Sequence, residues 1–538
     1  MAMPRGRMIW KIIHPDKSCR EFYVALDWCI ARTQGEESNR QLVARCEAEK
    51  MQIDRGNVAQ LPEHWELPMR TVVLARTTGG TNMAAGHGRD KSYSWVICVR
   101  EIDVLERLFN GALLNGNRFD STHYSRQRPY TVYWARRNGM ASITVEDEQV
   151  FAQQVMDQLA KSPYACSALQ RLSGGTANFV YRGTLTRPLH RPETELETAD
   201  ATTIVIKLYT DFVAVNRGFP LDITRCIFEE SMLSALAGFP RHIVTSSSHT
   251  LVKAPQLYSF DRKTHTQILE DFPDTADLTT ILESSSVSET LPGSCSQSVG
   301  LALGSWLHSF HEWASAPAQR DLVARVGPNE GMRRLKCLIT YDSFIEILER
   351  HPEVIEDHKS TLEHVKAFMK YEFERPATEA EETRGLIHGD FWAGNVLLPN
   401  GPWRETQSEQ LPNKLFIIDW ENAQFGHRSV DIGGILADFY ERNHFKGVAA
   451  SLQAMVGFVK GYGPLSEELA YRVAIHAGVH LICWYYRRDR NAPLPYPLPI
   501  IIDALTLGRD LILKGWAKDK AWLQTSILAP LFADENLV

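Results

Sequence analysis

The chain has 538 residues, of which 44% are apolar and 23% are charged, and its formal net charge is −7. This composition is typical of a globular protein and excludes wholesale disorder. No apolar run approaches the roughly 18 residues that a membrane-spanning helix needs, and no dense basic cluster indicates a nucleic-acid partner. The nine cysteines include no Cys-x-x-Cys pair, which predicts reduced thiols in a cytoplasmic protein and neither a disulfide framework nor a zinc site.

Residues 1–140 are predicted to be an N-terminal extension, to which the sequence assigns no fold or chemistry. Apolar patches in this stretch alternate with polar segments that contain glycine, and the glycines lack the spacing of a phosphate-binding loop. The first 17 residues are basic but have no apolar core of the kind found in secretory signals. A mitochondrial transit peptide is the alternative to a cytoplasmic location, although this segment is poor in serine.

Regular patterning begins near residue 146. Apolar residues at helical spacing predict an amphipathic helix over Glu146–Ser162, and alternation predicts a strand over Phe179–Leu185. Between them lies a turn-rich loop that consists of Ser173, Gly174, Gly175 and Thr176. Its backbone N–H groups would suit phosphate oxygens, because glycine permits a close approach. A plain hairpin turn is the alternative interpretation.

The β-branched run Thr202–Leu208 predicts another strand, with Lys207 near its end. A lysine in this position can reach nucleotide phosphates as a point charge, held by a carboxylate on a nearby helix. The segment Asp222–Leu236 is predicted to be that helix. Glu229 is the candidate carboxylate, and Glu230 is the alternative. Lys207 or Glu229, taken alone, is better explained as a solvated surface residue.

A strand is then predicted over Thr266–Leu269, directly before Glu270 and Asp271. The Ser/Gly/Pro-rich stretch Ser284–Ser298 is predicted to be a low-complexity linker. Amphipathic helical segments follow it, interrupted by two short apolar strands. An order of strands first and helices afterwards predicts a bilobal α+β protein.

The most specific segment is His388–Asn395, with the letters HGDFWAGN. An aspartate at the end of a buried strand and an asparagine five residues later fit kinase-type phosphoryl transfer. In that chemistry Asp390 accepts the proton of a substrate hydroxyl, and the carbonyl oxygen of Asn395 holds Mg²⁺. Asp419 follows the next apolar strand and supplies a second carboxylate, which a hard dication prefers as a ligand. Either aspartate alone would be explained as a turn residue, but the combination favours a kinase site.

These residues resemble the aminoglycoside phosphotransferase and choline kinase-like superfamily of small-molecule kinases, over about residues 148–450. The most specific matches are Leu386–Leu398 and Phe416–Glu421. The resemblance implies a protein-kinase-like fold, in which ATP lies between a small antiparallel-sheet lobe and a larger helical lobe. The implied lobes are residues 141–275 and residues 276–538. The implied site consists of Asp390 as catalytic base, Asn395 and Asp419 as Mg²⁺ ligands, and Lys207 as phosphate anchor.

The resemblance also implies supporting roles. His388 and Asp431 would buttress the catalytic loop. The segment Gln267–Phe272, which contains Glu270 and Asp271, would be the interlobe hinge that offers backbone groups to adenine. Two features differ from protein kinases: Gly389 stands where they carry arginine, and no Ala-Pro-Glu landmark follows Asp419.

The predicted function is ATP- and Mg²⁺-dependent transfer of the γ-phosphate to a hydroxyl, or an amine, of a small molecule. The alternatives are a catalytically inactive nucleotide-binding scaffold and a protein kinase. A cationic acceptor is suggested by Trp484, Tyr485 and Tyr486, because aromatic faces attract cations. Simple helix packing is the alternative explanation for these aromatic residues, and the sequence does not identify the acceptor.

Overall fold

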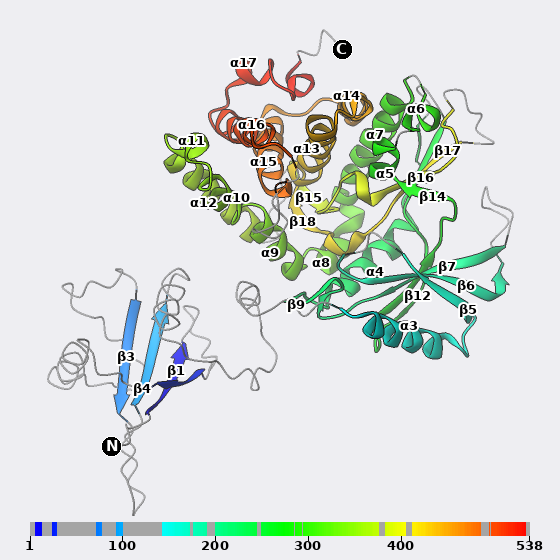
Figure 1. The fold of residues 1–538 in the computed structure, drawn as a ribbon, viewed down its shortest axis with the longest axis horizontal. Helices are drawn as coiled ribbons and strands as arrows, with labels where there is room; N and C mark the ends of the chain where they lie inside the picture. The colour runs from blue at the N-terminus through cyan, green and yellow to red at the C-terminus, as the bar shows by residue number, and fades with distance from the viewer. Residues whose placement is uncertain are drawn as a thin grey trace, which may run out of the picture. The chain divides into compact units, whose positions relative to one another are not determined.

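The computed structural model describes residues 143–172, 176–190, 200–240, 242–244, 249–284, 286–292, 294–375, 382–404, 412–485, 494 and 496–533, with four strands before residue 100. It divides into two compact units, Met1–Gln127 and Arg128–Val538. In the first unit the strands form one sheet in the order β2-β1-β4-β3 (Figure 1). These strands are β1 (Gly6–Ile12), β2 (Val24–Trp28), β3 (Thr71–Thr77) and β4 (Tyr93–Val99). Strand β1 is parallel to β4, and the other pairs are antiparallel.

The small lobe of the second unit is a five-stranded antiparallel sheet in the order β12-β13-β7-β6-β5. Its strands are β5 (Cys166–Arg171), β6 (Phe179–Leu189), β7 (Ala201–Leu208), β12 (Leu257–Asp261) and β13 (Thr266–Glu270). Helix α3 (Val145–Leu159) runs along the outer side of this sheet, and α4 (Arg225–Leu236) lies toward the other lobe (Figure 1). A short hairpin joins β8 (Phe212–Val213) and β9 (Asn216–Pro220). The predicted helices and strands of this region are all present, with ends shifted by a few residues.

Strand β7 explains how a lysine becomes buried in this lobe. Successive side chains of a strand point to opposite faces of the sheet. Ile204 and Ile206 pack in one apolar cluster with Val155 of α3. Val205 lies on the opposite face and packs against the core of the larger lobe. Lys207 shares the face of Val205 and is only 5% exposed.

Strands of the larger lobe support the predicted catalytic loops. One sheet has the order β10-β11-β17-β16-β14, and β15 pairs with β18 in a separate ribbon. The strands are β10 (His242–Val244), β11 (Thr250–Lys253), β14 (Thr275–Asp277), β15 (Arg384–Ile387), β16 (Val396–Pro399), β17 (Asn413–Ile417) and β18 (Gln424–His427). The segment His388–Asn395 connects β15 to β16, and Asp419 follows β17. Because Val396 of β16 pairs with Ile417 of β17, the end of the first loop lies beside the start of the second.

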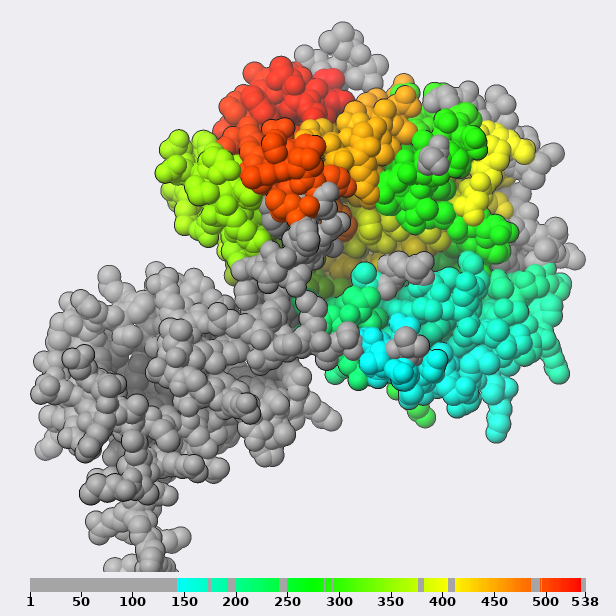
Figure 2. All heavy atoms as spheres, in the orientation of Figure 1, coloured from blue at the N-terminus to red at the C-terminus, as the bar shows by residue number. Residues whose placement is uncertain are grey.

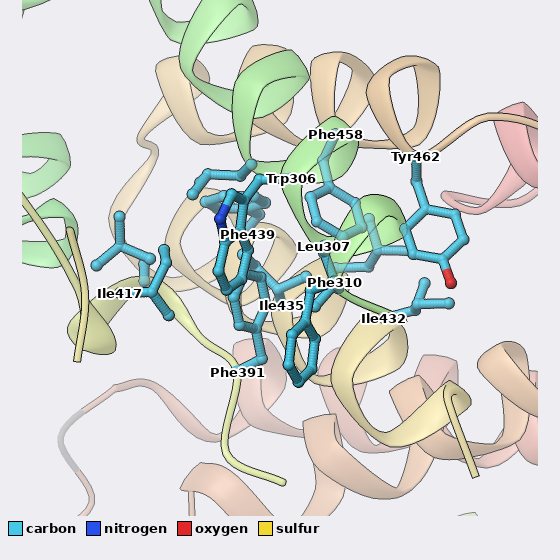
Figure 3. Packing of buried hydrophobic residues seen from close by; sticks show 14 of the residues in the cluster. Trp306, Leu307, Phe310, Phe391, Ile417, Ile432, Ile435, Phe439, Phe458 and Tyr462 are labelled. Carbon is cyan, nitrogen blue, oxygen red and sulfur yellow. The ribbon is translucent and has the colours of Figure 1, made fainter. Parts of the chain in front are cut away.

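The helices of the larger lobe surround an aromatic core (Figure 3). They include α5 (Leu278–Glu283), α6 (Val287–Thr290), α7 (Cys295–Ser315), α8 (Arg320–Val326), α9 (Glu330–Ile339), α10 (Phe344–Leu348), α11 (Pro352–Ile355), α12 (Lys359–Glu374), α13 (Ser429–Lys446), α14 (Ala449–Tyr462), α15 (Glu467–Tyr485), α16 (Leu498–Trp516) and α17 (Lys520–Leu523). The ring of Trp306 stacks on Phe310 at 5.6 Å and lies nearly parallel to Phe391 at 6.3 Å, measured between ring centroids. Since Phe391 directly follows Asp390, this core also anchors the catalytic loop.

The predicted bilobal α+β architecture is confirmed, with an antiparallel sheet in the small lobe and a larger helical lobe. Both lobes belong to the second unit, and the space-filling view shows the cyan and teal small lobe packed against the green to orange helical lobe (Figure 2). The lobe boundary near residue 275 stays a proposal, and β10 and β11, which lie within residues 141–275, belong to the sheet of the larger lobe. No helix in the described part of the chain is both long and apolar enough to cross a membrane.

The predicted linker over Ser284–Ser298 is wrong in part. Helix α6 occupies Val287–Thr290, and α7 begins at Cys295. Leu291 and Cys295 are buried, at 4% and 0% exposure, so this stretch contributes to the core. Its small polar residues belong to a tightly packed helix end, which composition alone does not distinguish from a linker.

Helices α7 and α14 pack with their backbones in close approach. A Cβ atom added to Gly300 or Gly304 would overlap backbone atoms of α14, and one added to Gly457 or Gly461 would overlap the backbone of α7. Each helix therefore contributes two glycines, four residues apart, to the same contact. A side chain at any of these positions would force the two helices apart.

We expect Gly304→Ala to lower the free energy of unfolding by about 1–3 kcal/mol, the usual cost of overpacking. The loss should appear even though alanine favours helix more than glycine does. Urea denaturation of the full-length protein measures it. Gly401→Ala is the matched control, since no atom lies within 4 Å of a Cβ added there. Equal midpoints for the two variants would contradict the role of the glycine contact.

Candidate active site

The ammonium group of Lys207 lies among three carboxylates. Its Nζ atom donates a hydrogen bond to Oε2 of Glu229 at 2.7 Å and another to Oδ1 of Asp419. Oε2 of Glu421 is 3.8 Å away. Burial disfavours the charged lysine, but the three carboxylates outweigh burial and raise the pKa of Lys207 above its ordinary value. The lysine is therefore a permanent cation at this position.

Glu229, and not the alternative Glu230, is the residue that faces Lys207. Its Oε1 atom accepts a hydrogen bond from the backbone N–H of Trp420 at 3.1 Å, and Oε2 also accepts one from the hydroxyl of Tyr209. Burial, reinforced by the neighbouring Glu229, raises the pKa of Tyr209 and keeps its hydroxyl protonated as a donor. Glu230 points elsewhere and pairs with Arg262 at 2.9 Å.

Asp419 is the most solvent-accessible of the three carboxylates around Lys207. Its side chain is 33% exposed, against 2% for each of the two glutamates. Its backbone has a positive φ of 67°, a conformation that aspartate tolerates better than most residues. The preceding residue, Ile418, donates a backbone hydrogen bond to the carbonyl oxygen of Asn395 at 3.0 Å. The loop of Asp419 is thereby joined to the loop of Asn395.

Glu421 is held in a buried polar network that sequence reasoning missed. Its Oε2 atom accepts hydrogen bonds from Nδ2 of Asn178 at 2.6 Å and from Nε of Arg225 at 3.2 Å. Arg225 also donates to Oδ1 of Asn178 at 2.7 Å. Burial raises the pKa of Glu421, although Lys207 and Arg225 oppose this shift. The network joins the residue before β6, helix α4 and the loop after Asp419.

Asp431 holds the predicted catalytic loop, His388–Asn395, through hydrogen bonds to its backbone. The backbone N–H groups of His388 and Gly389 each donate to one oxygen of Asp431 at 2.8 Å. Burial would raise the pKa of Asp431, but hydrogen bonds and charge from His311 and His388 lower it below its ordinary value. Gly389 has a positive φ of 80°, and a Cβ atom there would overlap the carbonyl oxygen of Asn422. This close approach explains why glycine occupies the position of the protein-kinase arginine.

Asp390 and Asn395 lie in direct contact. Nδ2 of Asn395 donates to the backbone carbonyl of Asp390 at 2.9 Å and lies 3.4 Å from its Oδ2 atom. Because the amide nitrogen binds Asp390, the amide oxygen is the atom that Asn395 can offer to a cation. Oxygen atoms from Asn395 and Asp419 are the ligand type that Mg²⁺ prefers. The residues present thus fit a Mg²⁺ ion.

Lys336 is a further residue at this site that sequence reasoning missed. Its Nζ atom donates to Oδ1 of Asp390 at 3.0 Å, and the residue is 5% exposed. In the sequence, Lys336 is distinguished by its position four residues after the apolar Met332. This spacing places both residues on one face of α9, and the structure shows that this face is buried. A single lysine on a helix is ordinarily solvated, so this signal was not informative by itself.

The remaining predicted residues are less directly connected to the site. Ser173, Gly174 and Gly175 lie outside the described residues, and Thr176 is exposed. The carboxylate of Glu270 pairs with Lys253 at 2.7 Å, and that of Asp271 pairs with Arg182 at 2.7 Å. Both carboxylates are thus bound by basic side chains of the protein, which favours the backbone of this segment over these two carboxylates as a candidate partner for adenine.

Residues 249–467 match the model of the phosphotransferase enzyme family, APH. The matched range includes Asp390, Asn395 and Asp419 and begins after Lys207. The chain therefore contains a phosphotransferase-family domain, and the resemblance inferred from the sequence motifs is confirmed.

The chain is similar to several phosphotransferases and small-molecule kinases. Phosphotransferase FrzJ of Cladobotryum sp is 29% identical over 401 residues, which cover 72% of this chain and 98% of the relative. The 4-hydroxytryptamine kinase of Psilocybe cubensis is 20% identical over 327 residues, covering 59% of this chain and 80% of the kinase. A solved choline/ethanolamine kinase family protein from Mesorhizobium loti has 13% identity and a TM-score of 0.36, covering 71% of this chain and 97% of its own.

The two aspartates should respond differently to neutral substitution. Asp419→Asn removes the accessible carboxylate, so we expect it to weaken Mg²⁺-dependent ATP binding and to abolish turnover. Asp390→Asn should leave ATP binding nearly unchanged and slow transfer by about 10²–10⁴-fold, the range for loss of a general base. Calorimetry measures ATP affinity, and product formation measures turnover. If Asp390→Asn lost ATP binding while Asp419→Asn kept it, the two roles would be exchanged.

The buried network of Glu421, Arg225 and Asn178 should contribute to the free energy of unfolding as well as to the geometry of the site. Arg225→Met leaves a buried carboxylate without one of its partners, which is expected to cost about 3–5 kcal/mol in denaturant unfolding. Adding Glu421→Gln should restore part of that loss, because the uncompensated charge is gone. Arg262→Met is the control. Arg262 pairs with Glu230 near the surface, so its loss should lower the free energy of unfolding by less than about 1 kcal/mol. Similar losses for both arginines would contradict the buried-charge explanation.

Proposed function

We propose that the protein is an ATP- and Mg²⁺-dependent kinase that transfers the γ-phosphate to a hydroxyl group of a small molecule. One observation carries this proposal. Lys207 and Asp419 are in contact although 212 residues separate them, and Asp419 is joined to Asp390 through Ile418 and Asn395. The residue types needed for phosphoryl transfer therefore form one connected site.

Each residue would have a defined task in this reaction. Lys207, held by Glu229, would bind nucleotide phosphate oxygens as a fixed positive charge. Asn395 and Asp419 would hold Mg²⁺, which neutralises charge on the phosphates when bound. Asp390 would orient the acceptor hydroxyl and accept its proton. Phosphoryl transfer depends mainly on such positioning and charge stabilisation, so these tasks account for catalysis without a covalent enzyme intermediate.

Several observations support the small-molecule acceptor. The match to the phosphotransferase family and the similarity to a phosphotransferase and to 4-hydroxytryptamine kinases favour an active enzyme over an inactive scaffold. The similarity to 4-hydroxytryptamine kinases also favours a hydroxyl acceptor. The close packing of Gly389 against Asn422 disfavours a protein-kinase loop. An amine acceptor remains the alternative to a hydroxyl.

Aromatic residues next to the catalytic loop would bind the acceptor. Trp484 of α15 lies 5.0 Å from Trp392 in an edge-to-face arrangement and stacks on His480 at 4.7 Å, both between ring centroids. Trp392 is only two residues from Asp390. These contacts support an acceptor with an aromatic ring or a cationic group. The side chains of Tyr485 and Tyr486, the other two aromatic residues proposed for this role, lie outside the described residues.

The proposal is tested by incubating the full-length protein with ATP and Mg²⁺ and a panel of small alcohols, phenols, amino sugars and amines. We expect ADP release that depends on both Mg²⁺ and one compound class, with a phosphorylated product detected by mass spectrometry. GTP in parallel determines nucleotide preference, and Asp419→Asn is the inactive control. Phosphorylation of protein substrates alone would indicate a protein kinase. Nucleotide binding without any turnover would indicate an inactive scaffold.

A further inference from the structure

Lys336 is a buried lysine that contacts the proposed catalytic base, Asp390, although it lies on neither of the two predicted catalytic loops. Lys336 lies on α9, and the exposed fraction of its side chain is 6%, against 22% for Asp390. Lysine normally extends its charged end into water, because burying an ammonium group is costly unless it is paired. The ion pair with Asp390, at 3.0 Å, compensates this cost. The helix thus delivers a positive charge to one oxygen of the base.

The carboxylate of Asp390 is contacted from two sides. Lys336 binds Oδ1, while Nδ2 of Asn395 lies 3.4 Å from Oδ2 and binds the backbone carbonyl at 2.9 Å. Two contacts on different oxygens restrict rotation of the carboxylate about its side-chain bonds. A base must be oriented as well as close to its proton, so this restriction bears directly on proton acceptance.

Helix α9 is itself attached to the loop that follows Asp419. Asn329, at the N-terminal end of α9, is 1% exposed and donates from Nδ2 to the backbone carbonyls of Glu421 and Ala423, both at 2.9 Å. Asn329 and Lys336 are seven residues apart, two turns of a helix, so they lie on a common face. Helix α9, which carries Lys336, is therefore attached to the proposed metal-binding loop.

We infer that Lys336, supplied by α9, is a positioning residue. It orients the carboxylate of Asp390 toward the acceptor hydroxyl. This inference rests on the proposed function. Lys336 would act through Asp390 and would not itself bind nucleotide. Its removal should therefore reduce the rate of transfer and leave ATP affinity unchanged.

The first test compares Lys336→Met and Lys336→Arg in the full-length protein. ADP formation is measured with ATP and Mg²⁺, using water alone and the best compound of the acceptor panel as probes. Lys336→Met should lower kcat by about 10–100-fold, since small misplacements of a catalytic group cost up to about 10²-fold. Calorimetric ATP affinity should change less than about twofold, and Lys336→Arg should recover part of kcat. Arg334→Met is the control, because Arg334 is exposed on the same helix and pairs with the exposed Glu330 at 3.0 Å.

The second test places Lys336→Met in the Asp390→Asn background. If Lys336 acts through Asp390, the double variant should be no slower than Asp390→Asn alone, because residues that act as a unit are non-additive. Multiplicative losses would show an independent role and overturn the inference. Where Lys336→Met alone fails to fold, the double variant removes both buried charges, and Lys336→Gln provides a polar replacement.

The outcomes separate the inference from the proposed function. An active wild-type protein with an unchanged Lys336→Met variant would overturn the inference alone. A loss of turnover explained entirely by weaker ATP binding would also overturn it. A wild-type protein without any ATP turnover would overturn the proposed function and, with it, the inference.

Discussion

The ammonium of Lys207 joins strand β7, helix α4 and the loop after β17 through its contacts with Glu229, Asp419 and Glu421. Charges this deeply buried are tolerated only when paired, so the three elements are held in one arrangement. The network also includes Arg225, which gives two basic groups against three carboxylates. The surplus negative charge lies nearest solvent at Asp419, where a divalent cation would be attracted.

The proximity of the proposed catalytic residues could be predicted because they are close together in sequence or end neighbouring strands. Asp390 and Asn395 are five residues apart on one loop, and Asp419 ends the neighbouring strand. The sequence favoured Glu229 over Glu230 without excluding Glu230, because adjacent helical residues point about 100° apart and the sequence does not give the rotation of α4. Lys336 was missed because its partner is 54 residues away and nothing nearby distinguishes it from a solvated lysine.

The error over Ser284–Ser298 has a related physical cause. Small residues are typical of flexible linkers, but they are also required where two helix backbones approach closely. Ser296 and Ser298 are buried at 1% and 6% exposure near the start of α7, whose later glycines contact α14. Composition reports side-chain size and polarity, whereas only the tertiary contact decides whether small side chains are packed or solvated.

Helix α9 gives a second connection between two loops that the hydrogen bond from Ile418 to Asn395 already joins. Its ten residues span about 15 Å, with Asn329 bound to the carbonyls of Glu421 and Ala423 and Lys336 bound to Asp390. A helix of this length moves as a nearly rigid body. We therefore expect a displacement of the loop after Asp419 to be transmitted to Asp390, so that the distance between these two aspartates varies less than the position of either one.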